Sequence, residues 1–182
     1  RRGRRRLRWR RCLGTVVEMA IKRFLKHLAT TRRAAHQAFP ADALDRIEQT
    51  IREVEARHDG QIRFVVEAAL DMGPLWQQQS PRERALEVFA LQGVWDTPDN
   101  NGILLYVLMA DHAVEIVCDR GIHACESAGT WDAVCRGIQE AFGQGRYEQG
   151  AVDGITALGA SLARHYPGAS RANTLPDRPQ IM

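Results

Sequence analysis

The sequence predicts an α/β fold in which a small central mixed sheet carries helices on both faces. The run ILLYVLM at 103–109 is apolar without alternation, which is typical of a central strand covered on both sides. A second strand-like segment, 113–119, follows after a short turn, so the two are expected to form a β-hairpin. Segments 41–58, 127–142 and 147–166 repeat apolar residues at helical spacing. This alternation of elements indicates an α/β/α sandwich.

Length and composition exclude several other classes of protein. A chain of 182 residues suits one domain with tails. Its 45% hydrophobic and 26% charged residues are those of an ordinary globular protein, which excludes wholesale disorder. No stretch approaches the roughly 18 consecutive apolar residues of a membrane-spanning helix. The sequence also contains no glycine-rich nucleotide-binding motif.

The N-terminal region is predicted to form two helices. Residues 20–38 show an apolar face with basic groups opposite, and the helix is expected to end before Pro40, since a residue preceding proline avoids helical geometry. The second helix, 41–58, ends at the turn signal Asp59-Gly60.

The middle of the chain is predicted to contain a strand, a loop and a capped helix. Residues 62–69 (IRFVVEAA) are β-branched and aromatic, which favours a strand. A loop is expected at 70–79. Ser80 then precedes Pro81, and Glu83 completes a capping-box pattern for a helix that continues to about residue 93.

Three strands are few for a sheet, and a weak fourth strand is expected at 70–76 or just before Trp95.

Glu67, within the strand at 62–69, is expected to form a structural ion pair with Arg63 or Arg120 rather than to act as a base.

Charge divides the chain sharply. Residues 1–18 carry a net charge of +7, residues 19–33 carry +5, and residues 34–182 carry −9. Because duplex nucleic acid requires a positive surface, the acidic body predicts no nucleic-acid partner. The predicted divisions are a mis-assigned start or disordered arginine-rich segment at 1–18, a basic amphipathic helix at 19–40, the α/β domain at 41–167 and a disordered tail at 168–182. A polyanion-binding or targeting arm is the alternative for the first segment.

The basic N-terminal helix has two alternative roles. Lys22, Lys26 and Arg33 lie opposite Phe24 and Leu28, so residues 20–38 could contact anionic lipid peripherally. Packing against the domain is the favoured alternative. The four cysteines form no CxxC motif and no signal peptide is evident, so we expect free thiols and a cytoplasmic protein.

Hairpin geometry predicts one polar edge of the sheet. The start of strand 103–109 and the end of strand 113–119 meet there, which brings their flanking loops together. The residues expected at this edge are Asp96, Asp99, Asn100, Asn101, Asp119, His123 and Glu126, with Asp71 joining them if strand 62–69 runs parallel to strand 113–119. Carboxylates and amides suit a hard cation such as Ca²⁺ or Mg²⁺, although Asp and Asn also populate loops because they turn well.

Three motifs carry a family resemblance over residues 42–166. They are Asn100-Asn101-Gly102 before the apolar strand, Asp119-Arg120-Gly121 after the hairpin, and the GxYxxG segment at 145–150. With these motifs the sequence resembles the TPM domain family, which includes a thylakoid-lumen phosphatase linked to photosystem II repair and bacterial proteins often encoded beside LemA-type proteins.

The resemblance implies a small sheet between helices, and a cation site, acid phosphatase activity or both. On that basis the expected metal ligands are Asp96, Asp99, Asn100 and Asp119, and Arg120 is a candidate phosphate ligand. The primary expectation is a cation-binding, protein-interaction module in a membrane-linked process, and a metal-assisted acid phosphatase is the alternative. The sequence departs from the family in lacking an evident signal peptide and C-terminal anchor, and in replacing a glycine-rich loop by WDTPDN.

Overall fold

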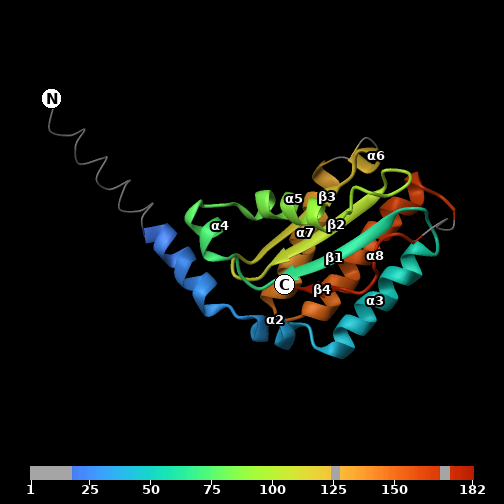
Figure 1. The fold of residues 1–182 in the computed structure, drawn as a ribbon. Helices are drawn as coiled ribbons and strands as arrows, with labels where there is room; N and C mark the ends of the chain where they lie inside the picture. The colour runs from blue at the N-terminus through green and yellow to red at the C-terminus, as the bar shows by residue number, and fades with distance from the viewer. Residues whose placement is uncertain (1–17, 124–127, 169–172) are drawn as a thin grey trace, which may run out of the picture.

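The computed structural model describes residues 18–123, 128–168 and 173–182 and confirms the predicted α/β sandwich (Figure 1). Its helices are an N-terminal helix at residues 18–29, α2 (Arg32–Ala38), α3 (Ala41–Glu55), α4 (Met72–Trp76), α5 (Pro81–Leu91), α6 (Arg120–His123), α7 (Ala128–Gly143) and α8 (Tyr147–His165). The strands are β1 (Gln61–Glu67), β2 (Gly102–Leu108), β3 (Ala113–Cys118) and β4 (Gln180–Ile181).

The four strands form one mixed sheet in the order β3-β2-β1-β4. β1 runs parallel to β2, with Ile62 opposite Ile103, and β2 and β3 form the predicted antiparallel hairpin, with Ile103 opposite Cys118. β4 pairs in parallel with the outer edge of β1. β1 is therefore antiparallel to β3, which decides which loops meet at each end of the sheet.

Both faces of the sheet are covered, as the unbroken apolar run in β2 predicts. Ile103, Leu105 and Val107 join the core beneath α2, α3, α7 and α8, whereas Leu104 and Tyr106 join the core beneath α5. The two layers of helices are visible on opposite sides of the sheet in Figure 1. All seven residues of β2 are buried, which is why this strand shows no polar alternation.

Local capping confirms one predicted helix and divides another. The Ser80 hydroxyl accepts a hydrogen bond from the Glu83 amide, and the Glu83 carboxylate accepts one from the Ser80 amide, so the predicted capping box begins α5. The prediction of a single helix over 20–38 is wrong. Thr31 caps a new helix, α2, by accepting a hydrogen bond from Ala34 N.

The prediction of a disordered tail is wrong for the last ten residues. β4 supplies the fourth strand, and Met182 N donates to Val66 O on the outer edge of β1. The Arg63 guanidinium anchors the same segment by donating to the carbonyl oxygens of Pro176 and Arg178 at 2.9 and 2.7 Å. This segment satisfies backbone groups that the edge of β1 would otherwise leave unpaired.

Other differences concern short elements. The expected fourth strand at 70–76 is instead the short helix α4, within the segment predicted as a loop, and α6 follows β3 without a periodic signal. The predicted segment 1–18 lies outside the described residues except for Glu18, which is helical. None of the helices in the described segments combines the length and apolarity that crossing a bilayer requires.

Candidate functional site

The hairpin brings the two predicted loops together at one end of the sheet. Asp119 N donates to Gly102 O at 2.9 Å, which continues the β2–β3 pairing by one residue. Gly121 N then donates to Asn100 O at 3.1 Å, so the chain after β3 folds back onto the loop before β2. The predicted contact between the loop before β2 and the segment after β3 is thus confirmed at Asn100. We call residues 96–101 and 119–121 the loop edge.

The carboxylate of Asp119 occupies an unusual position within the loop edge. Its side chain is buried, at 7% exposure, although the next residue, Arg120, is exposed. Oδ1 accepts a hydrogen bond from Arg120 N at 2.7 Å, whereas the buried Oδ2 has no hydrogen-bond partner among the described residues. A buried carboxylate oxygen without a partner carries a desolvation cost that a bound cation would offset.

The other predicted residues of the loop edge are exposed. Asp96, Asp99 and Asn100 lie on the surface of the loop before β2, and Arg120 is exposed at the start of α6. Asn100 has a φ of 52°, a left-handed geometry that asparagine tolerates better than most residues. The backbone oxygens of Asp99 and Asn100 lie beside Gly121, two residues after Asp119.

Asn101 is a buried member of the loop edge that the predicted ligand set omits. Its Nδ2 donates to the carbonyl oxygen of Asp59, and its backbone N donates to Thr97 Oγ1 at 3.0 Å. Like Asp119 Oδ2, its side-chain oxygen is buried and has no hydrogen-bond partner in the described segments. The sequence signal that could have identified Asn101 is its place as the second asparagine of Asn100-Asn101-Gly102. It directly precedes Gly102, whose carbonyl oxygen accepts a hydrogen bond from Asp119 N.

Gly121 permits a close approach of backbone oxygens at the loop edge. A Cβ at this position would lie 2.7 Å from both Asn100 O and the Tyr166 hydroxyl oxygen, and 3.3 Å from Asp99 O. Two carbonyl oxygens and a hydroxyl therefore converge on the segment that follows Asp119. Any side chain here would displace them.

The chemistry of the loop edge is that of oxygen donors. Among the described residues no three His, Cys, Asp or Glu side chains gather closely enough to hold a metal, so Asp96, Asp99 and Asp119 do not form a three-carboxylate cluster. A site here would combine the Asp119 carboxylate with amide and carbonyl oxygens. Such mixed oxygen sets suit Ca²⁺, which accepts six to eight ligands in flexible geometry.

Two further expectations for this edge meet different outcomes. Asp71 does not join it, because β1 runs antiparallel to β3 and the residues after β1 lie at the opposite end of the sheet. Glu126 lies outside the described residues, and nothing is described of the His123 side chain.

Glu67 forms a structural ion pair, but with a different partner from either one expected. Its two oxygens accept from Arg84 Nε and Nη2, each at 2.9 Å, and Tyr106 donates its hydroxyl to Oε2 at 2.6 Å. The prediction of Arg63 or Arg120 as partner is wrong. Arg63 faces the C-terminal segment instead, and Arg120 lies at the other end of the sheet.

His58 is a buried imidazole close to the loop edge. It is fully buried in the segment between α3 and β1. The next residue, Asp59, receives the Asn101 side chain and donates its backbone N to Tyr166 O at 3.0 Å. Burial is the main cause that lowers the pKa of His58 below 6.5, so the ring is neutral at physiological pH.

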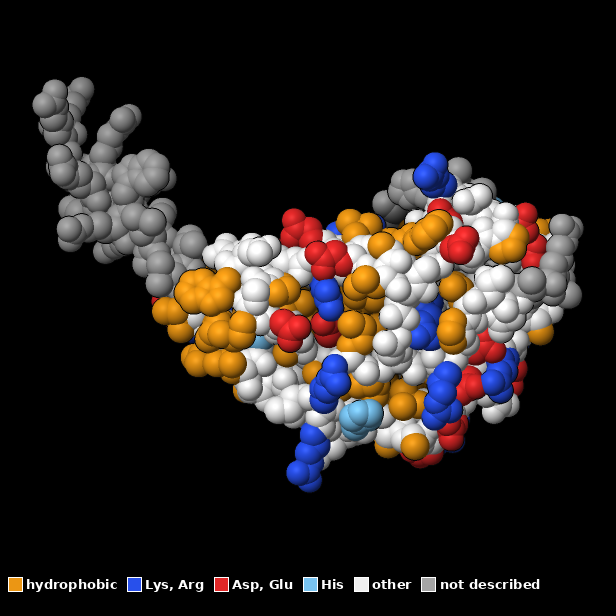
Figure 2. Space-filling view, in the orientation of Figure 1, with side chains coloured by type: hydrophobic (Ala, Val, Ile, Leu, Met, Phe, Trp, Pro, Cys, Tyr) orange, Lys and Arg blue, Asp and Glu red, His pale blue; other side chains and the backbone are white. Residues whose placement is uncertain are grey.

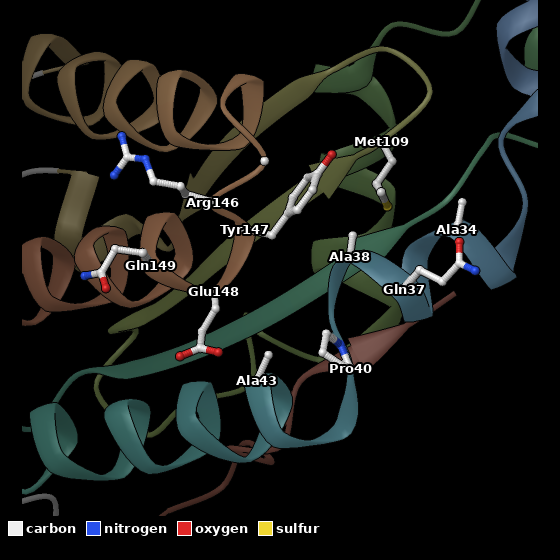
Figure 3. Close-up of a pocket in the computed structure, with 11 residues that line it drawn as sticks. Ala34, Gln37, Ala38, Pro40, Ala43, Met109, Arg146, Tyr147, Glu148 and Gln149 are labelled. Carbon is white, nitrogen blue, oxygen red and sulfur yellow. The ribbon is translucent and has the colours of Figure 1, made fainter.

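A surface hollow lies away from the loop edge. It measures about 710 Å³ and lies between α2, the start of α3 and the start of α8, beside Met109 at the end of β2 (Figure 3). The charged groups of its lining are already engaged, since Glu148 pairs with Arg46 at 2.6 Å and Arg146 donates to Gln144. Its lining offers no set of groups arranged for catalysis.

Neither described cysteine forms a disulfide, as expected. Cys118 and Cys135 are both half-buried. Burial, with smaller contributions from nearby carboxylates, raises the pKa of Cys135 to about 11, so its reactive thiolate is scarce at neutral pH.

Comparisons with known proteins identify relatives of this fold. A family model described as the TPM domain matches residues 34–161. The NMR structure of the BA42 protein from the psychrophilic bacterium Bizionia argentinensis is 31% identical with a TM-score of 0.66, covering 79% of this chain and 95% of that one. The N-terminal domain of a P. gingivalis protein is similar in fold alone, at 18% identity and a TM-score of 0.56, covering 71% of this chain and 82% of that one. A search of the curated proteins finds no match.

Proposed function

Because the chain belongs to the TPM domain family, we propose that it is a divalent-cation-binding, protein-interaction module whose cation site is the loop edge around Asp119. One observation carries the proposal: within the part of the chain that the structure describes, the buried oxygen Asp119 Oδ2 has no hydrogen-bond partner, and it lies where two loops of the sheet meet. The unpartnered side-chain oxygen of the neighbouring Asn101 supports it. A hard cation would satisfy both oxygens.

The residues present fit Ca²⁺ better than Mg²⁺. Asp119 and Asn101 would be the buried ligands, and the exposed Asp96, Asp99 and Asn100 would supply further oxygens from the neighbouring loop. Ca²⁺ accepts an irregular set of carboxylate, amide and carbonyl oxygens, whereas Mg²⁺ demands near-octahedral geometry and retains its waters. We therefore expect Ca²⁺ to bind more tightly than Mg²⁺.

Calorimetric titration with CaCl₂ and MgCl₂ tests the site directly. We expect heat of Ca²⁺ binding at or below millimolar concentration, and at least a tenfold loss of affinity in Asp119→Asn. Asp42→Asn is the matched control, because this exposed carboxylate lies at the start of α3 and outside the loop edge. Absence of heat up to 10 mM of either metal, or equal loss in the two variants, contradicts the proposal.

A metal-assisted acid phosphatase is the second candidate, favoured by the position of Arg120. This exposed guanidinium follows the buried carboxylate directly, and its backbone N is bonded to Asp119 Oδ1. A cation held by Asp119 would polarise a phosphoryl oxygen, and Arg120 would bind the phosphate. Hydrolysis of p-nitrophenyl phosphate, with Ca²⁺, Mg²⁺ or EDTA, tests this activity in the wild type, Asp119→Asn and Arg120→Gln. Metal-dependent turnover that both variants lose supports it, whereas calcium binding without turnover leaves the binding module alone.

A further inference from the structure

The N-terminal helix contacts the domain through its polar side. Arg23 Nη2 lies 2.8 Å from Asp111 Oδ2 and donates to Gln79 O at 2.6 Å. His27 is buried between two partners: Leu70 N donates to Nδ1 at 3.0 Å, and Nε2 lies 3.1 Å from Asp111 Oδ1. Since Nδ1 accepts, the ring proton lies on Nε2 and is directed at Asp111. The helix is thus fixed by polar contacts at the turn between β2 and β3.

The apolar side of the same helix consequently faces away from the core. Ile21, Leu25 and Leu28 recur at steps of four and three residues, which places them on one stripe. Their exposures are 54%, 58% and 58%. An amphipathic helix normally buries this stripe in the core and exposes its polar side. Here the arrangement is reversed, and the polar contacts of Arg23 and His27 maintain it.

Helix α4 extends the exposed stripe into a continuous patch. Phe24 packs edge-to-face on Trp76 at a centroid distance of 6.4 Å, and Trp76 is still 77% exposed. Figure 2 shows hydrophobic side chains gathered where the N-terminal helix and α4 lie in Figure 1. We define the apolar end patch as Met19, Ile21, Leu25, Leu28, Met72 and Trp76, all about half exposed or more.

The charges around the apolar end patch select its partner. Lys22 and Lys26 are exposed on the same helix, and residues 19–33 carry a net charge of +5 against −9 for residues 34–182. Two copies meeting through this patch would bring two such positive segments together, which opposes self-association. An anionic bilayer attracts lysines beside an apolar stripe, and tryptophan is favoured at the headgroup level.

We propose that the apolar end patch binds the surface of an anionic lipid bilayer, with the N-terminal helix and α4 lying in the headgroup region. The patch lies at the hairpin-turn end of the sheet, and the loop edge lies at the other end. The cation site would therefore face away from the bilayer. This inference goes beyond the proposed cation binding and does not depend on it.

Flotation of the full chain with vesicles tests the proposal. The vesicles are pure phosphatidylcholine or a 70:30 mixture of phosphatidylcholine and phosphatidylserine, and all buffers contain EDTA so that no cation bridges protein and lipid. The test variant Leu25→Gln/Leu28→Gln removes two side chains of the stripe and keeps every charge and a helix-favouring residue. The matched control Leu86→Gln/Leu91→Gln makes the same change at two exposed leucines of α5.

We expect the wild type and the α5 control to float with the anionic vesicles. At the same lipid concentration, the vesicle-bound fraction of the test variant should be at least tenfold lower. Binding to pure phosphatidylcholine should be at least tenfold weaker than to the mixture. Failure of the wild type to float, or equal binding by the test variant, overturns the proposal. A wild-type dimer that the test variant converts to a monomer, measured by light scattering, also overturns it, because a second copy would then cover the patch. Loss of calcium binding in Asp119→Asn leaves flotation unchanged.

Discussion

Glu55, a buried carboxylate at the end of α3, should make the stability of the fold fall as pH rises. Its side chain accepts a hydrogen bond from Ile62 N at 2.6 Å and is 5% exposed. Burial is the main cause that raises the pKa of Glu55 to about 8, from 4.5 in an exposed carboxyl. The folded state therefore binds a proton that the unfolded state releases above pH 4.5. The stability that this proton contributes is complete below pH 4.5 and is lost as pH rises through about 8.

The magnitude follows from the two pKa values of Glu55. Moving the pKa from 4.5 to about 8 corresponds to a full cost of about 5 kcal/mol for ionising Glu55 in the folded state. Most of this cost is present at pH 9, about 3 kcal/mol at pH 7, and less than about 1 kcal/mol at pH 5. Glu55→Gln keeps an oxygen for Ile62 N and never ionises, so it should stabilise the fold by several kcal/mol at pH 9 and little at pH 5.

Urea unfolding at pH 5, 7 and 9, followed by circular dichroism, measures this dependence. Glu53→Gln is the matched control, since it removes an exposed carboxylate on the same helix and should change stability by less than about 0.5 kcal/mol. Other titrating groups are common to all three proteins and cancel in the differences. A Glu55→Gln effect that is equal at pH 5 and pH 9, or that destabilises at pH 9, would refute the reasoning.

Three further predictions concern two buried polar side chains and the glycine of the loop edge. Glu67→Gln leaves the mostly buried Arg84 without its carboxylate and should lower the free energy of unfolding by about 3 kcal/mol in urea titrations. Gly121→Ala places a Cβ 2.7 Å from Asn100 O, so it should displace the loop edge and weaken calcium binding at least tenfold by calorimetry. Burial lowers the pKa of His58, so its contribution to stability falls as pH drops below about 6.5; His58→Leu should lose less stability than the wild type between pH 7 and 5.

Specific outcomes would contradict each of these predictions. Glu87→Gln removes an exposed ion-pair partner of the same Arg84, so a loss equal to that of Glu67→Gln would show that burial is not the cause. Unchanged calcium affinity in Gly121→Ala, with unchanged circular dichroism, would remove the loop edge as the site. Parallel pH profiles for His58→Leu and the wild type would show that the buried imidazole does not control acid stability.

Features governed by neighbouring residues were predictable from the sequence. Ser80 and Glu83 marked the start of α5, and the unbroken apolar run marked β2 as a strand covered on both faces. The hairpin placed the loop before β2 beside Asp119, which identified the loop edge. Caps, turns and periodic burial depend on residues a few positions apart, so the sequence displays them directly.

Features governed by distant residues were not predictable. β4 has only two residues and no pattern of its own. It forms because it pairs with the open edge of β1 and because Arg63 donates to the carbonyl oxygen of Arg178 just before it. The position of Asp71 depended on the direction of β1, which the pairing with β2 decides. Arg84 as the partner of Glu67 depends on how α5 packs against the sheet.

The sequence by itself determined the α/β class, the principal helices and strands and the acidic body with its basic N-terminal segment. Only the tertiary structure decided that Asp119 is buried, with one oxygen unpartnered among the described residues, and that the apolar stripe of the N-terminal helix faces outward. The helical period shows that a stripe exists, but contacts between Arg23 and Asp111, 88 residues apart, decide which side of the helix meets the domain. Such contacts depend on the packing of the whole chain, which no local pattern records.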